Sequence, residues 1–278
     1  MLGKLMKDEL KATFKPMLLI YGLLIIISVL LTAVFKFNID GLIAGAGEKS
    51  DVFGMILSFL MMTLFFIYFI LSIVSVTAMY FYAIKRFKNR LLENENTVNY
   101  KPCWEIVAKC VVSSMWTLIG FIAVLISYCI IIFGSLRSEF YVAFSEMVKV
   151  LEIGDKFKPE NIMFFIELAL LGGVLVVISI VLEYLHIYAS MAVGYSFKTH
   201  KGLKSIGIYI LIDLAASNLE MVFINLFSLN ESLLSNWYMV FMVSIVITIV
   251  EAAIYFAIAN YYIKKSLKYE INSSDVDS

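Results

Sequence analysis

The sequence predicts an all-α, polytopic membrane protein with six transmembrane helices, and two observations carry this prediction. Hydrophobic residues make up 62% of the 278 residues, which is more apolar surface than a water-soluble fold of this length can bury. The sequence also contains six apolar runs, each long enough to cross ~30 Å of hydrocarbon as a helix. Helices are expected because lipid offers no partner for an unpaired backbone amide, and the alternating segments of membrane β-barrels are absent from the sequence.

The apolar runs predict a single transmembrane domain over residues 1–278, with six spans in residues 17–262. In chain order the expected spans are Met17–Phe35, Phe53–Ile84, Val111–Phe133, Ile162–Tyr195, Ile206–Phe227 and Tyr238–Tyr262. The second span is long enough to extend about 48 Å as a helix, so it should tilt or project beyond the bilayer. The polar residues 271–278 are expected to form a flexible tail.

Residues 1–15 are expected to form an amphipathic elbow helix that lies at the membrane interface. Its apolar residues share one side of the helix: Leu2, Leu5, Met6, Leu10 and Phe14. Pro16 then suits a turn or kink into the first span. Glu9 falls within the apolar arc, where a charge without a partner is costly. We expect Glu9 to form an ion pair with Arg86 or Lys88 of a cytoplasmic loop, and the alternative is a contact with a polar lipid headgroup.

The distribution of basic residues predicts the orientation. An even number of spans places both termini on one side of the membrane. With the N-terminus inside, the cytoplasmic segments hold 16 of the 22 Lys and Arg residues, so the positive-inside rule favours cytoplasmic N- and C-termini. The formal net charge is zero, which gives no indication of a nucleic-acid partner.

Sequence motifs give no support for an enzyme. The chain contains no P-loop, no H-E-x-x-H zinc motif and no G-x-S-x-G nucleophile elbow. Glu183 and His186 have the Glu-x-x-His spacing of di-iron bundles, but such sites need two copies of the motif and the chain has only two histidines. We therefore expect no metal site. Cys103, Cys110 and Cys129 are expected to be free thiols.

Five acidic residues fall within the expected spans, without Lys or Arg at comparable depth: Glu167, Glu183, Asp213, Glu220 and Glu251. A charged acid at the bilayer centre costs about 2.5–3.5 kcal/mol on insertion scales. Asp213 and Glu251 lie near the midplane, so we expect them to face the protein interior or a partner subunit. One interpretation is a translocation path for a cation or proton through Glu183, Asp213, Glu220 and Glu251. The structural alternative is that protonated acids bridge helices through hydrogen bonds.

Four segments resemble a known family. They are MLGKLMKDELKAT at the start, RFKNRLLENEN at Arg86–Asn96, GYSFKTHKGLKSIG at Gly194–Gly207, and NYYIKKSLKYE before the tail. Together with six spans, they resemble the permease subunit of type-2 ATP-binding-cassette (ABC) transporters in its Gram-positive bacterial form. The resemblance implies a multi-pass exporter subunit of the bacterial plasma membrane. It also implies a second permease copy or a related permease as partner, and separate ATPase subunits that bind ATP and Mg, so the chain itself needs no cofactor.

The resemblance further implies that cytoplasmic loop helices dock into the ATPase. The implied coupling residues are Arg86, Phe87, Lys88, Asn89, Leu91, Leu92 and Glu95 in the first loop, and Lys198, His200 and Lys201 in the second. The alternative for the first loop is an ordinary basic topology anchor. Two other function classes stay open: an ion-coupled secondary transporter that uses the acids within the spans, and a non-transporting membrane scaffold or sensor subunit.

Overall fold

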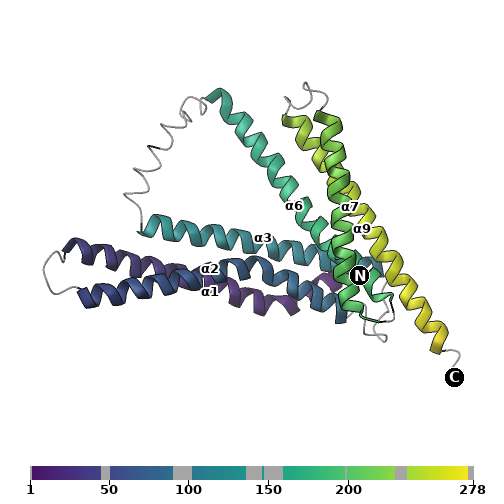
Figure 1. Cartoon of the computed structure of the whole chain (residues 1–278), viewed down its shortest axis with the longest axis horizontal. Helices are drawn as coiled ribbons and strands as arrows, with labels where there is room; N and C mark the ends of the chain where they lie inside the picture. Colours follow the sequence, from purple (N-terminus) through teal and green to yellow (C-terminus); the bar gives the residue numbers. More distant parts are fainter. Residues whose placement is uncertain are drawn as a thin grey trace. The chain divides into compact units, whose positions relative to one another are not determined.

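The described part of the chain consists of long helices. The computed structural model describes residues 2–44, 51–89, 102–135, 146, 159–197, 199–228 and 237–274. These ranges contain α1 (Leu2–Ala44), α2 (Asp51–Phe87), α3 (Pro102–Ser135), α6 (Pro159–Tyr195), α7 (Lys201–Ser228) and α9 (Trp237–Ser274) (Figure 1). Each of the six is long and apolar enough to cross a membrane, and no strand occurs in these ranges. The prediction of an all-α, multi-pass membrane protein is confirmed.

The helices include all six expected spans and extend beyond them. α1 is one continuous helix that runs through Pro16, so the expected elbow and first span are not separated by a turn. Pro16 has no N–H to donate to the carbonyl of Ala12, which leaves that one helical bond unmade. α9 continues through Ser274, so the first four residues of the expected flexible tail are helical.

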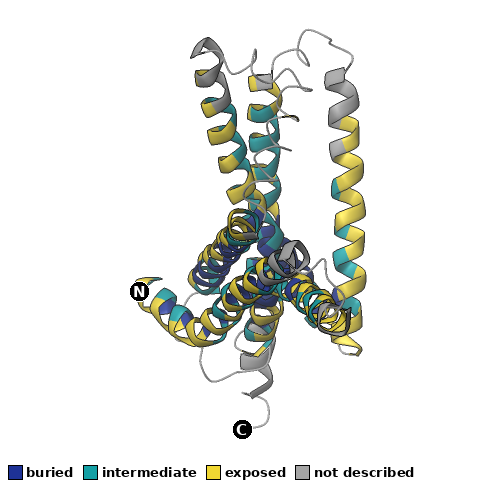
Figure 2. Cartoon of the chain, turned by 90° about the vertical axis from the view of Figure 1, so that its left-hand side faces the viewer, coloured by how far each residue is buried: buried dark blue, intermediate teal, exposed yellow. Residues whose placement is uncertain are grey.

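The exposed surface of the helices is apolar, as a bilayer requires. Phe59 and Met62 on α2 are each 74% exposed, and large hydrophobic residues are exposed along every other described helix as well. Figure 2 shows buried residues on the faces where helices meet and exposed residues on the opposite faces. In water these exposed faces would be an aggregation hazard, whereas in lipid they are the favourable surface.

The described helices pack as two compact units, and four of the helices contribute to both. Unit 1 comprises Met1–Ala12, Tyr80–Met115 and Phe165–Ser278, and unit 2 comprises Thr13–Met79 and Trp116–Phe164. The N-terminal residues of α1, the last turns of α2 and the first half of α3 therefore pack with α6, α7 and α9. The remainder of α1, α2 and α3 forms unit 2 together with the first residues of α6, up to Phe164.

Unit 2 is held together by hydroxyl groups between closely packed helices. The Tyr21 hydroxyl on α1 donates to the carbonyl of Trp116 on α3 at 2.7 Å, and the Trp116 indole N–H donates to Thr13 Oγ1 at 2.9 Å. A Cβ at Gly120 of α3 would lie 2.8 Å from the carbonyl oxygen of Ser75 on α2. Small residues and interhelical hydrogen bonds replace the hydrophobic driving force that lipid does not provide.

Unit 1 contains a set of stacked aromatic rings between α2 and α6. Tyr80 stacks on Tyr184 with ring centroids 4.8 Å apart, and Phe87 stacks on Tyr188 at 4.4 Å with the rings 4° from parallel. Phe87, Tyr184 and Tyr188 have no exposed surface. Tyr80 and Phe87 are seven residues apart on α2, and Tyr184 and Tyr188 are four apart on α6, so each pair of residues lies on one face of its helix. Both stacked pairs therefore belong to the same interface between α2 and α6.

Candidate functional site

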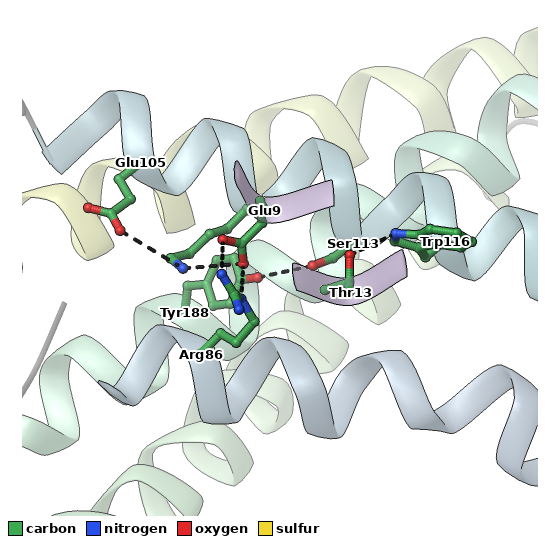
Figure 3. Close-up of polar contacts among 8 residues, drawn as sticks. Glu9, Thr13, Arg86, Glu105, Ser113, Trp116 and Tyr188 are labelled. Atoms are coloured by element: carbon green, nitrogen blue, oxygen red, sulfur yellow. Dashed lines mark hydrogen bonds and ion pairs between the residues drawn. The ribbon is translucent and has the colours of Figure 1, made fainter. Parts of the chain in front are cut away.

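The first candidate site is an ion-pair network around Glu9 in unit 1. In α1 the buried positions Leu5 and Glu9 are one helical turn apart, and Glu9 is only 3% exposed. Arg86 of α2 donates from Nε to Glu9 Oε1 at 2.7 Å and from Nη2 to Oε2 at 2.8 Å. Lys109 of α3 donates to Glu9 Oε1 at 3.3 Å. Figure 3 shows the side chains of Glu9 and Arg86 directed toward one another, with the dashed lines marking their two hydrogen bonds.

The network is electrically balanced. Lys109 Nζ also lies 3.9 Å from Glu105 Oε1 on the preceding turn of α3, so two carboxylates face two cations. The Glu9–Arg86 contact is bidentate, which adds geometric specificity to the charge interaction. Arg86 was one of the two residues expected to pair with Glu9. The contribution of Lys109 was missed, although its position two residues before an apolar run indicates a cation that needs a protein partner.

The first loop leaves α2 directly from this network, and its first two residues face inward. Arg86 is occupied by Glu9, and Phe87 is fully buried against Tyr188. In this chain, Arg86 is therefore engaged with α1 and Phe87 with α6, and the docking role that the resemblance implied for them stays a prediction. Asn89 is exposed and Lys88 is half-buried. Leu91, Leu92 and Glu95 lie outside the described residues.

The second loop is a tight connection between α6 and α7. A Cβ at Gly194 would lie 2.6 Å from both Cα and N of Ser205, so only glycine permits this approach of the two helices. His200 adopts the left-handed backbone conformation with φ of 52°, and its carbonyl accepts from the Lys204 N–H at 3.0 Å as α7 begins. His200 and Lys201 are exposed, as docking would require, and Lys198 lies outside the described residues.

The second candidate site joins acidic and aromatic residues of α6, α7 and α9. The Tyr209 hydroxyl on α7 donates to Glu183 Oε1 on α6 at 2.7 Å. His186, one turn along α6 from Glu183, is 5% exposed. Its ring stacks between Tyr209 at 4.2 Å and Tyr255 of α9 at 5.0 Å. The sequence indicated that Glu183 and His186 share a face, but it did not identify the two tyrosines that enclose the imidazole.

The other acids expected on a translocation path differ in their surroundings. Asp213 is exposed on α7, so the interior of this chain does not cover it. It is nevertheless close enough to His186 and Tyr209 for electrostatic interaction. Glu251 is half-buried on α9. Glu220 lies in α7, but its side chain is outside the described residues. Glu167, nearer the other end of α6, accepts a hydrogen bond from Tyr238.

Metal-binding and disulfide chemistry find no support in the described residues. No group of three or more His, Cys, Asp or Glu side chains among them is arranged to hold a metal ion. Cys103, Cys110 and Cys129 are free thiols, and the Cys110 thiol lies 3.6 Å from the carbonyl of Val181. The candidate sites therefore offer charge, hydrogen bonds and aromatic surface.

Comparison of the chain with protein-family models, with curated proteins and with solved structures gave no match.

Proposed function

We propose that the chain is the membrane-spanning permease subunit of a bacterial type-2 ABC exporter, driven by a separate ATPase subunit. The six membrane-crossing helices fit this role, and four segments outside the apolar centres of the helices resemble that family. The sequence contains no P-loop, so the energy for transport has to come from another chain or from an ion gradient.

The observation that best supports the proposal is the rigid exit of the first loop from α2. Arg86 is bonded to α1 through Glu9, and Phe87 is stacked on α6 through Tyr188. A displacement of Lys88 and Asn89, which follow directly, would therefore act on α1, α2 and α6 through these contacts. A topology anchor needs positive charge on this side of the membrane but does not need fixed side chains.

The proposal is tested by affinity purification of the chain from native membranes, with co-purifying proteins identified by mass spectrometry. We expect an ABC ATPase among them. The double variant L91D/L92D should weaken ATPase binding by about tenfold or more, because burial of each leucine in a partner pocket contributes about 1.5–3 kcal/mol. The matched control N94D/N96D adds the same charge to the same loop without removing apolar surface, and it should retain the partner.

Abundance of both variants in the membrane is measured alongside, so that loss of binding is separated from loss of the protein. Undiminished ATPase binding and coupling in L91D/L92D would show that the loop serves only as a topology anchor. Absence of any ATPase from the purified wild-type complex would contradict the proposed function itself.

An ion-coupled secondary transporter is the second candidate, and the cluster of Glu183, His186 and Asp213 favours it. Ionisable side chains within membrane spans often mark ion or proton pathways. The chain alone, reconstituted in proteoliposomes, distinguishes the two functions. Flux driven by a proton or sodium gradient without ATP would support the secondary transporter and would contradict the ABC permease.

A further inference from the structure

The cluster around His186 brings polar groups from four helical segments of unit 1 together. Glu183 and His186 lie on α6, Tyr209 and Asp213 on α7, and Tyr255 on α9. Tyr80 near the end of α2 also interacts electrostatically with Glu183. Asp213 is exposed, Glu183 is half-buried and His186 is buried, so the cluster combines accessible negative charge with a buried imidazole.

The charge of this cluster is not balanced within the described residues. Glu183 accepts a hydrogen bond from Tyr209 but forms no ion pair there, and Asp213 has neither a hydrogen bond nor an ion pair in that part of the chain. The network around Glu9 shows the opposite arrangement, because Arg86 and Lys109 both neutralise its carboxylate. Carboxylates within a membrane span require a compensating positive charge, a proton or water.

His186 provides an independent indication that the cluster accepts a ligand. Its side chain is 95% removed from solvent, and its Nε2 atom has no hydrogen-bond partner among the described residues. A buried polar atom without a partner is costly and calls for an explanation such as a missing ligand. The imidazole ring stacks on both Tyr209 and Tyr255, and these contacts restrain its orientation.

We infer that this cluster recognises the ammonium group of an amphipathic organic cation. Glu183 and Asp213 supply the negative charge, His186 Nε2 accepts one N–H, and the tyrosine rings supply surfaces that attract a cation. A metal ion does not fit, because the described side chains form no metal-binding group. The inference rests on the proposed transport function, since it names the class of substrate for that path, but binding itself requires no ATPase.

Binding is tested on the purified full-length chain in nanodiscs, with radiolabelled octylamine as the probe and empty nanodiscs as the background. Octyltrimethylammonium has the charge but no N–H, and octanol has the same chain but no charge. We expect saturable binding of octylamine, several-fold weaker competition by octyltrimethylammonium, and no competition by octanol. Loss of one charged hydrogen bond in E183Q or D213N should weaken octylamine binding by about tenfold or more.

The chain supplies a matched control in Glu167. It lies on the same helix and accepts a hydrogen bond from a tyrosine, Tyr238, but lies sixteen residues from Glu183. E167Q should bind octylamine as the wild type does. D213N keeps the test decisive if E183Q does not fold, because the Asp213 side chain is exposed and makes no hydrogen bond in the described structure.

Equal binding by wild type, E183Q and D213N would overturn the inference, as would full competition by octanol or the absence of saturable binding. Absence of binding would leave Glu183 with a structural role only, as the acceptor that joins α6 to Tyr209 of α7. The assay contains no ATPase, so a negative result here leaves the co-purification result unaffected. If the chain binds octylamine at this site but binds no ATPase, the inferred cation site stands and the proposed ABC permease function is contradicted.

Discussion

Removal of the Glu9 charge tests whether the ion-pair network stabilises unit 1. In E9Q, Arg86 and Lys109 lose their shared carboxylate. Their side chains are not equally affected, because that of Arg86 is 23% exposed and that of Lys109 only 2%. In E9Q the partly exposed Arg86 guanidinium can be hydrated by water. The Lys109 ammonium stays buried, and its remaining carboxylate partner is Glu105, at 3.9 Å. Breaking one side of a buried pair costs about 3–5 kcal/mol, and the partial exposure of Arg86 places the expected loss at about 3 kcal/mol.

A double-mutant cycle separates the interaction from packing. K109M removes the most buried cation but leaves the bidentate Glu9–Arg86 contact intact, so it should cost about 1 kcal/mol. E9Q/K109M should lose less unfolding free energy than the sum of the losses in E9Q and K109M. The reason is that the buried Lys109 charge, which E9Q leaves without its carboxylate, is absent from the double variant.

The measurement is the free energy of unfolding in bicelles by steric trapping, which reports equilibrium stability without extraction from the bilayer environment. A loss in E9Q of less than about 0.5 kcal/mol, which is the scale of a typical surface substitution, would refute the reasoning. If the losses of unfolding free energy in E9Q and K109M add up to the loss in the double variant, Glu9 and Lys109 do not interact energetically.

Three further predictions use matched variants. G194A should lose about 1–3 kcal/mol in the same unfolding assay because a Cβ there overlaps the backbone of α7, whereas G202A has open space and should be neutral or slightly stabilising. F87A should cost about 3–5 kcal/mol, while F81A, which removes a ring that is 72% exposed, should change little; equal losses would contradict the stacking argument. D213N should reduce transport of a cationic substrate by about tenfold or more at unchanged membrane abundance, and unchanged transport would give Asp213 a structural role only.

The fold was predictable because bilayer thickness imposes a strong constraint on sequence. Each apolar run coincides with a helix, and the apolar arc around Glu9 indicated a basic partner, which was expected at Arg86 or Lys88 of a cytoplasmic loop and is found at Arg86. Helix bounds were less predictable, because a helix that leaves the membrane, such as α9, continues through polar residues wherever the backbone bonds remain favourable. Pro16 was expected to mark a turn, yet a single missing hydrogen bond does not end a helix of 43 residues.

The side-chain environments were harder to predict because they depend on contacts between distant segments. Phe87 looked like a loop residue available for docking, and only the position of Tyr188, about 100 residues later, reveals that it is buried. Asp213 was expected to face the protein interior or a partner subunit, and in this chain it is exposed on α7. The face on which a midspan residue lies depends on helix rotation, which a uniformly apolar sequence does not specify. Prediction of the stacking of His186 on Tyr209 and Tyr255 likewise requires knowledge of which residues of α7 and α9 lie opposite α6.

The contacts of Glu9 also impose an order on biosynthesis. Arg86 and Lys109 follow it by 77 and 100 residues, and a bacterial or eukaryotic ribosome adds about 5–20 residues per second. For roughly 5–20 s after Glu9 is made, the nascent chain therefore carries an acidic residue on an apolar helix face before both of its cations have been synthesised. During that interval the segment has to remain near water or the insertion machinery. Although α1 is made before the other five described helices, it can therefore be among the last of them to reach its final contacts.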